Sequence, residues 1–296
     1  MGDDPRLTLE TPDRPLRRPV LVAAFRGWND AGDAASFAVE HLGRAWGAET
    51  IGGIDPEDFF DFQAVRPQVR LEDGLTRTIT WPSNEFLAAH MPAAQHDVLL
   101  LVGTEPNLRW RSFTKIVTDV AMKFETQLVI TLGALLADVP HSRPVPITGT
   151  AGDRALIDRL QLQRSRYEGP TGIVGVLHDA CRRAGLDSAS LWAAVPHYVA
   201  VSPNPKAAVA LIEAATRLVG APVEIDALVK ASADYERRVG EMVSEDEDVA
   251  AYVRLLEARS DERTNDLETE LPSGEALAAE LESFLRRRNE GEDTGA

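Results

Sequence analysis

Apolar and polar residues follow one another along this chain in blocks that predict strands, turns and helices in alternation. The clearest block is an unbroken apolar run over residues 19–25, long enough for one buried strand. A turn rich in Gly, Asn and Asp follows at residues 27–33, and residues 35–45 then predict a helix. Strand, polar turn and helix in this order are the opening unit of a layered α/β domain.

The same alternation continues to residue 220. Apolar segments predict further strands at residues 48–54, 59–62, 98–102, 128–132, 145–147 and 191–195. Apolar residues at helical spacing predict helices at residues 110–124, 171–184 and 206–219. Around Asp73-Gly74, two segments of alternating apolar and polar residues predict a hairpin over residues 69–80. The predicted fold is therefore α/β, a three-layer sandwich whose central sheet is mainly parallel but mixed.

Composition divides the chain into three predicted parts. Residues 1–18 are polar and proline-containing, which favours a flexible segment, and residues 19–220 form the α/β core. Residues 221–296 carry helical patterns only and form a C-terminal helical appendage. That appendage is predicted to contain a helix up to residue 243, a second helix that restarts at the capping box Ser244–Glu247, a charged linker at residues 260–270 and a final helix that opens at Pro272.

Most of the negative charge of the chain lies in its C-terminal region. The 296 residues carry a formal net charge of −16, and residues 221–296 contain 21 acidic and 9 basic side chains. Nucleic acids and anionic membranes attract basic surfaces, so this composition argues against both as partners. Residues 1–6 lack a signal-peptide pattern, and no apolar run approaches the ~18 residues of a membrane helix. Together with a single cysteine, Cys181, this predicts a cytoplasmic protein.

Polar side chains gather where the first predicted strand ends. Trp28, Asn29, Asp30 and Asp33 lie in the turn, and ligands or partners of open α/β sheets meet the carboxyl ends of strands. These four residues are therefore candidates for a binding surface or pocket. A local interpretation explains the same residue types, because Asn29 or Asp30 can cap the helix and the glycines permit the turn. Trp28 is either a lid over the core or an interface anchor.

A second group of candidates, Glu105, Asn107 and Arg109, follows the buried strand at residues 98–102. In one interpretation, Glu105 and Arg109 converge with Asp30 on one crevice. In the other, the proline after Glu105 breaks the chain and Glu105 supports the loop.

The turn Gly27-Trp28-Asn29-Asp30-Ala31-Gly32 resembles the signature turn of the proteasome assembly chaperone 2 family, in its bacterial branch. Four further segments agree with that family in the same order: Gly103–Asn107, Thr131–Leu135, Gly169–Gly172, and Val195–Tyr198 with Asn204-Pro205. The resemblance implies a fold like the nucleoside phosphorylases and a binding role more than a reaction, with protein partners such as proteasome subunits. Proteasome-binding members of the family end in a hydrophobic-Tyr-any tail. This sequence ends in Glu292-Asp293-Thr294-Gly295-Ala296, so we do not expect that tail to dock.

Motifs for catalysis or metal binding are not evident. The six histidines lack metal-ligand spacing, no Gly-x-Ser-x-Gly elbow is present, and the loop at residues 148–153 lacks a phosphate-binding lysine. Cys181 and His178 share one face of a predicted helix, but a buried thiol explains them better than a nucleophile pair. We therefore expect no catalytic residue, no metal and no cofactor.

These observations lead to one main function hypothesis and two others. The main hypothesis is a non-catalytic protein-binding protein that is homo-oligomeric and resembles proteasome assembly chaperones. The alternative is a small-molecule enzyme, a nucleoside-type hydrolase or phosphorylase, with a pocket at the strand ends near Asp30 and Glu105. A third hypothesis is a scaffold whose acidic helices bind a basic partner.

The protein is predicted to be a homo-oligomer in solution, because aromatic residues near loops are typical of surfaces that close on each other. Five aromatic residues carry this prediction: Trp28, Phe59, Phe60, Trp81 and Trp110. Light scattering across the micromolar range should give a multiple of the single-chain mass. One mass of 32.3 kDa at every concentration would contradict it.

Overall fold

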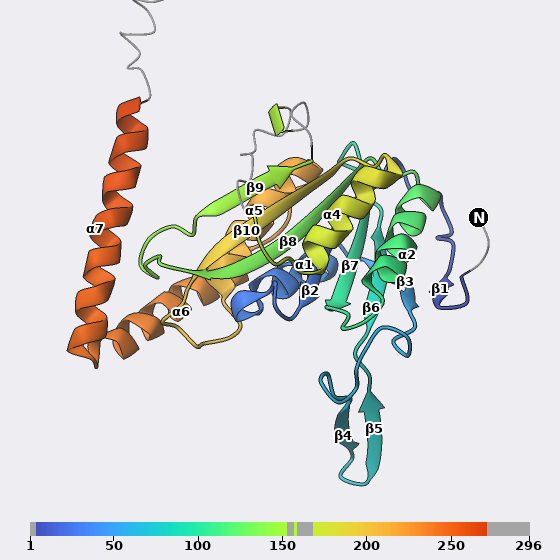
Figure 1. The fold of residues 1–296 in the computed structure, drawn as a ribbon, viewed down its shortest axis with the longest axis horizontal. Coiled ribbons are helices and arrows are strands. Elements are labelled where there is room, and N and C mark those ends of the chain that lie inside the picture. The colour runs from blue at the N-terminus through green and yellow to red at the C-terminus, as the bar shows by residue number, and fades with distance from the viewer. Residues whose placement is uncertain (1–3, 153–156, 159–167, 271–296) are drawn as a thin grey trace, which may run out of the picture.

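The computed structural model describes residues 4–152, 157–158 and 168–270, and its centre is one eight-stranded sheet (Figure 1). The strands lie in the order β1 (Leu7–Leu9), β3 (Glu49–Ile54), β6 (Asn84–Ala89), β7 (Val98–Thr104), β2 (Val20–Arg26), β8 (Leu128–Ala137), β10 (Ser188–Pro196) and β9 (Ile147–Ala151). The central strands β7, β2, β8 and β10 are mutually parallel, and the strands on either side pair antiparallel.

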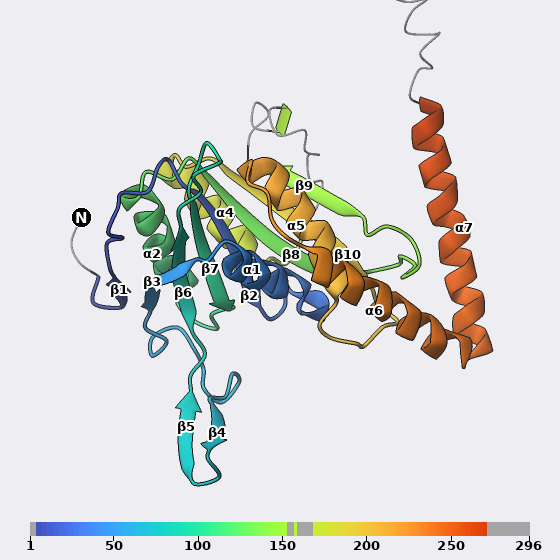
Figure 2. The same cartoon turned by 180° about the vertical axis from the view of Figure 1, so that it is seen from behind.

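Helices cover both faces of this sheet. On one face lie α1 (Ala34–Ala45) and α5 (Pro205–Val219), and on the other lie α2 (Trp110–Lys123) and α4 (Ile173–Ala184) (Figures 1 and 2). Strand β2 is buried over its apolar run because it lies between two parallel neighbours and beneath helices on both sides. The predicted three-layer sandwich with a mixed central sheet is confirmed.

Several predicted strands differ from the observed ones. Residues 59–62 form turns instead of a strand, and Phe59 is buried with its ring 5.5 Å from that of Phe113. These aromatic residues fill the core under a loop, which a short apolar run does not distinguish from a strand. Strand β6 was not predicted, and β9 begins at Ile147, where the predicted strand ends. Strand β1 lies in the segment predicted to be flexible and pairs with β3.

The five aromatic residues that motivate homo-oligomerisation divide into two groups. Phe59 and Phe60 are buried in the core, and Trp110 is partly buried. Trp28 and Trp81 are the two of the five that remain exposed. Surface contact can therefore rest on these two tryptophans but not on the phenylalanines.

The predicted hairpin is confirmed and projects away from the body of the fold (Figure 1). It consists of β4 (Gln68–Glu72) and β5 (Thr76–Thr80), which pair with each other and form a separate two-stranded sheet. Every residue of both strands is exposed.

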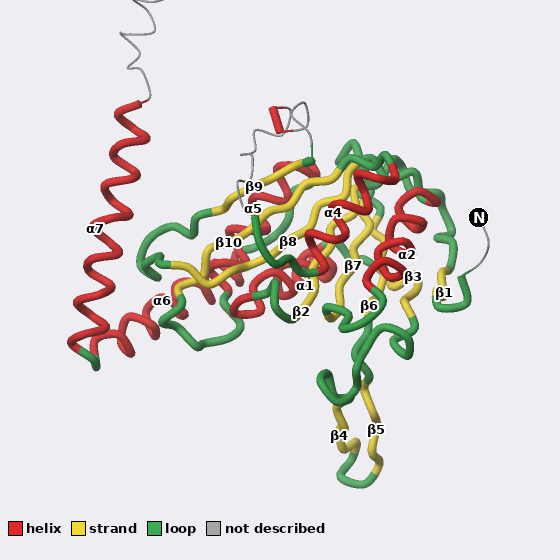
Figure 3. Tube along the Cα trace, viewed as in Figure 1, coloured by secondary structure: helices red, strands yellow, loops and turns green. Residues whose placement is uncertain are grey.

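Two helices follow the core, α6 (Asp226–Ser244) and α7 (Glu247–Glu270) (Figure 3). The prediction of a linker at residues 260–270 is wrong, because those residues continue α7. Charged side chains on an exposed helix face water and leave the backbone hydrogen bonds intact, so a charge-rich segment need not be irregular. The predicted final helix after Pro272 lies outside the described residues. Among the helices that the structure describes, none is long and apolar enough to cross a membrane.

A chain that ends at Ser260 should unfold within about 4 °C of the full chain. It loses the ion pair of Arg143 with Asp261, and a pair this exposed contributes little to the free energy of unfolding. A chain that ends at Asp246 also loses the buried Val253 and Leu256, and should lose considerably more stability. Calorimetry of the three chains measures this difference. Equal midpoints for the two truncations would show that α7 does not pack on the core.

Candidate functional site

The segments that carry the family resemblance converge at the carboxyl ends of the parallel strands. The turn after β2 is fixed by backbone hydrogen bonds to three neighbours. Glu105 N donates to Arg26 O at 2.8 Å, Ala134 N donates to Asn29 O at 2.8 Å, and Asn204 N donates to Gly32 O at 2.8 Å. Residues far apart in the sequence thus lie on one surface, where open α/β sheets present their sites.

The Glu105 carboxylate is the hub of this surface. Its Oε1 accepts hydrogen bonds from Asn29 Nδ2 at 2.8 Å and from Ile173 N at 2.8 Å. Its Oε2 accepts a longer bond from Trp28 N at 3.3 Å. Ile173 is the first residue of α4, so the carboxylate also faces the positive end of that helix dipole. One side chain therefore ties the ends of β2 and β7 to the start of α4.

Gly172 makes this arrangement possible because it has no side chain. A Cβ at this position would lie 2.3 Å from Asn29 Nδ2 and 2.7 Å from Glu105 Oε1, closer than real contacts allow. The sequence predicted residues 169–172 only as a turn and helix cap. The close approach of Asn29 and Glu105 explains why a glycine stands there.

Asp30 accepts its side-chain hydrogen bonds from the first turn of α1. Its Oδ1 accepts from Ala35 N at 2.7 Å, and its Oδ2 accepts from Ser36 Oγ at 2.5 Å. The side chain is 5% exposed, and this burial raises the pKa of the Asp30 carboxyl, against the opposing effect of its hydrogen bonds. The local interpretation of Asp30 as a helix cap therefore agrees with the geometry.

The other candidates have separate partners. Arg109 forms an ion pair with Asp58 at 2.7 Å, so it does not converge with Glu105 and Asp30 on one crevice. Asn107 Oδ1 accepts a hydrogen bond from the backbone N of Asp61 at 3.0 Å. This contact fixes residues 55–62, which belong to the loop between β3 and β4. Asp33 accepts a hydrogen bond from Ser202.

Trp28 is the exception to this pattern of internal bonding. Its side chain is 68% exposed, although the neighbouring Asn29 is only 2% exposed. Asn29 and Glu105 hold the backbone beneath it, so the turn is fixed while the indole faces solvent. A large aromatic on a rigid support is the kind of residue that anchors protein interfaces.

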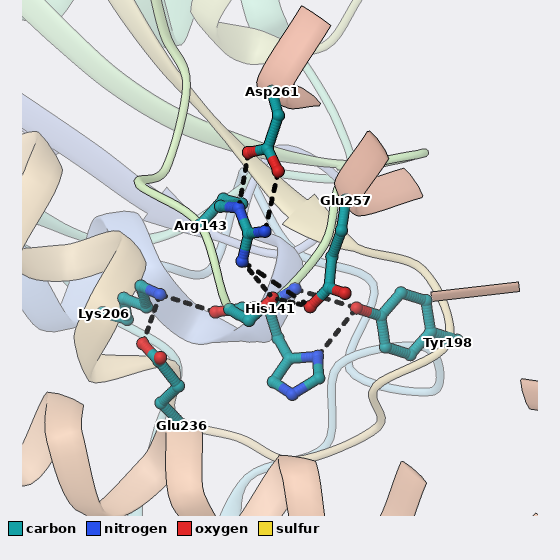
Figure 4. A network of polar contacts seen from close by, with 8 residues as sticks. His141, Arg143, Tyr198, Lys206, Glu236, Glu257 and Asp261 are labelled. Atoms are coloured by element: carbon teal, nitrogen blue, oxygen red, sulfur yellow. Dashed lines mark hydrogen bonds and ion pairs between the residues drawn. The ribbon is translucent and has the colours of Figure 1, made fainter. Parts of the chain in front are cut away.

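A second polar network, which the sequence did not predict, joins the core to the C-terminal helices (Figure 4). His141 N and Nδ1 both contact Tyr198 Oη, at 2.8 and 2.9 Å, and burial raises the pKa of Tyr198 to about 12. Lys206 Nζ donates to His141 O at 2.5 Å and pairs with Glu236 of α6. The contacts join loop residues to α5 and α6, and this pairing follows only from the fold, although Tyr198 lies in one of the family-like segments.

The same network reaches α7 through the loop after β8. Arg143 donates to both carboxylate oxygens of Asp261, at 2.7 and 2.8 Å, and Ser142 donates to Glu257. Burial lowers the pKa of the His141 imidazole, which favours its neutral form. These contacts dock the helical appendage and use the polar groups for structure.

Cys181 and His178 of α4 each have surroundings that do not favour a thiolate–imidazole pair. Burial raises the pKa of the Cys181 thiol to about 12, so it stays protonated near neutral pH. His178 contacts Ser188 Oγ at 2.9 Å. Within residues 4–152, 157–158 and 168–270, no group of three or more metal-ligating side chains comes together.

Comparison with known proteins identifies a family and several solved structures to which this chain is similar. The sequence model of the PAC2 family matches residues 24–243. A PAC2 family protein of Streptomyces avermitilis is 45% identical, covers 79% of this chain and 99% of its own, and superposes with a TM-score of 0.74. A proteasome-assembly chaperone homologue of Mycobacterium tuberculosis is 46% identical with the same coverage and a TM-score of 0.73. A second M. tuberculosis protein, of unknown function, is 28% identical, covers 91% of this chain and 93% of its own, and has a TM-score of 0.81. A search of curated proteins found no match.

Substituting Gly172→Ala should destabilise the fold by about 1–3 kcal/mol, because the new methyl group pushes Asn29 and Glu105 apart. Gly240→Ala in α6 is the matched control. Its Cβ would meet nothing closer than His141 Nε2 at 3.6 Å, and alanine favours a helix by up to about 1 kcal/mol. Urea unfolding of both variants measures the difference. Equal effects would show that the contact between Gly172, Asn29 and Glu105 is not tight.

Proposed function

This chain belongs to the PAC2 family, and from that premise we propose that it is a non-catalytic protein-binding protein with a chaperone-like role, whose binding surface is the strand-end turn that carries Trp28. One observation carries the proposal. The polar side chains at the strand ends are engaged in hydrogen bonds within the fold, whereas the aromatic side chain between them is exposed.

This division of roles suits binding better than catalysis. A catalytic acid or base must reach a substrate atom. Asp30 instead bonds to the first turn of α1, and Glu105 bonds to Asn29 and to the first turn of α4. A protein interface requires a rigid, exposed anchor, and aromatic anchors of this kind contribute much of the binding energy. Trp28 meets that requirement.

The partners we propose are proteasome subunits and further copies of this chain. A 46% identical relative is described as a proteasome-assembly chaperone homologue, which supports the first class of partner. The proposed contact uses the folded surface around the exposed Trp28. Asn29, Asp30 and Glu105 act in this proposal as positioning residues for the turn.

Replacing Trp28→Ala should weaken binding to purified proteasome subunits of the source organism about 10- to 30-fold, the usual effect of removing an interface tryptophan. Met122→Ala is the control, because Met122 is also a large exposed apolar side chain but lies on α2. Biolayer interferometry with both variants measures the affinities, and circular dichroism checks that both remain folded.

Three outcomes would overturn the proposal. The first is wild-type affinity in the Trp28→Ala variant, and the second is no affinity in the wild type. The third is turnover of a nucleoside or ester by the wild type that either Asp30→Asn or Glu105→Gln abolishes. That result would favour the small-molecule enzyme with a pocket at the strand ends.

A further inference from the structure

The last residues of β8 have a free edge beside the turn that follows β2. On one side, β8 pairs with β10 in register from Val129 to Ala137 (Figure 1). On the other side, its ladder with β2 covers only residues 128–131. A single bridge between Asp30 and Ala134 follows, and within the residues that the structure describes no strand pairs with this side of β8 beyond it.

The turn after β2 leaves this edge uncovered because the chain bends away into α1. Ala134 N donates to Asn29 O at 2.8 Å, which holds the turn against β8. Gly32 and Asp33 then adopt positive φ angles of 61° and 49°, and α1 begins at the next residue. The residues that could have extended β2 alongside β8 therefore form a short 3-10 turn and a helix.

The backbone groups of Leu136 point to this free edge. Along a strand, the backbone groups of alternate residues point to the same side. Ala134 N points to the turn after β2, whereas Ala137 O accepts from His197 N at 3.3 Å on the β10 side. The N–H and C=O of Leu136 therefore lie on the same side as those of Ala134, where they can pair with one further strand.

The side chains at this edge are apolar and exposed. Natural sheet edges are usually blunted by short strands, prolines, bulges or charges. The two outer edges of this sheet follow that rule, since β1 has three residues and β9 begins directly after Pro146. The free edge of β8 instead carries Leu135 and Leu136, which are 44% and 58% exposed, beside the turn with the exposed Trp28. An unprotected apolar edge is suited to a partner that adds a strand.

We propose that an extended, apolar segment of a partner protein adds to the sheet at the free edge of β8, beside Trp28. Its main chain pairs with the N–H and C=O of Leu136. Its side chains alternate between the two faces of the sheet, so they contact Leu135 on one face and Leu136 on the other. This inference rests on the proposed function and states how the partner binds, by main-chain hydrogen bonds next to the aromatic anchor.

Hydrogen exchange of the full chain measures the state of this edge residue by residue. In the free chain the Leu136 amide should exchange quickly, whereas the Leu135 and Ala137 amides point toward β10 and should exchange slowly. In the complex with purified proteasome subunits of the source organism, exchange at Leu136 should slow about 100-fold or more, and the two control amides should change little. Mass spectrometry with single-residue fragmentation measures all three.

Two substitutions at Leu136 separate the backbone contact from the side-chain contact. Leu136→Pro removes the N–H, which a strand tolerates where that N–H is unpaired. It should weaken binding of the same subunits about tenfold more than Leu136→Ala, which keeps the N–H. Leu135→Pro is the matched control for the fold. Its lost N–H points toward β10, so it should lower the midpoint of thermal unfolding further than Leu136→Pro does.

Several results would overturn the added strand, and they differ in what they leave standing. No complex with the wild type overturns the proposed function and this inference with it. A complex that depends on Trp28 but leaves exchange at Leu136 unchanged overturns the added strand alone, as do equal affinities of Leu136→Pro and Leu136→Ala. Slow exchange at Leu136 in the free chain would show that the edge is already covered. Slowing that increases with the concentration of the chain alone would show that a second copy covers it.

Discussion

The hydrogen bonds of the Glu105 carboxylate are the interaction on which the strand-end surface depends. Through Asn29 and Ile173 they connect the turn after β2, the end of β7 and the start of α4. Hydrogen bonds to a charged group contribute about 1.5–3 kcal/mol, and the helix terminus adds to that attraction. The same carboxylate accepts hydrogen bonds from the Asn29 side chain and from the backbone N of Trp28, so the backbone of both residues is fixed. The exposed indole of Trp28 therefore stands on a rigid base.

The sheet could be predicted from the sequence because burial on both faces produces continuous apolar runs. Strand β2, at the centre, is the clearest case, and the helices that cover it have apolar residues at helical spacing. The missed strand β6 has an exposed Glu85 and a buried Asn84, which interrupt the pattern. Charge density was misleading at residues 260–270, because many charged residues do not prevent a helix, and those residues continue α7.

The candidate site could be predicted only as a set of residues. The sequence identifies polar residues after strands, and the structure determines which of them meet. Glu105 bonds to Asn29 and not to Asp30, and Arg109 bonds to Asp58. Such pairings depend on the twist of the sheet and on loop paths, which local residue patterns do not encode. The role of Gly172 is also invisible in sequence, because it depends on side chains that approach from two other segments.

The fold separates the residues that hold a surface in place from the residues that such a surface can offer to a partner. Buried and half-buried carboxylates and amides fix the strand ends, and the network around His141 and Tyr198 fixes the helical appendage. The large apolar side chains that remain exposed include Trp28 at the strand ends and Leu75 at the hairpin tip. Exposed groups of this size lose contact with water at low entropic cost when their backbone is already ordered. A scaffold that uses its polar groups internally is therefore suited to bind other proteins through a few rigid apolar anchors, and this is the physical basis for a binding role.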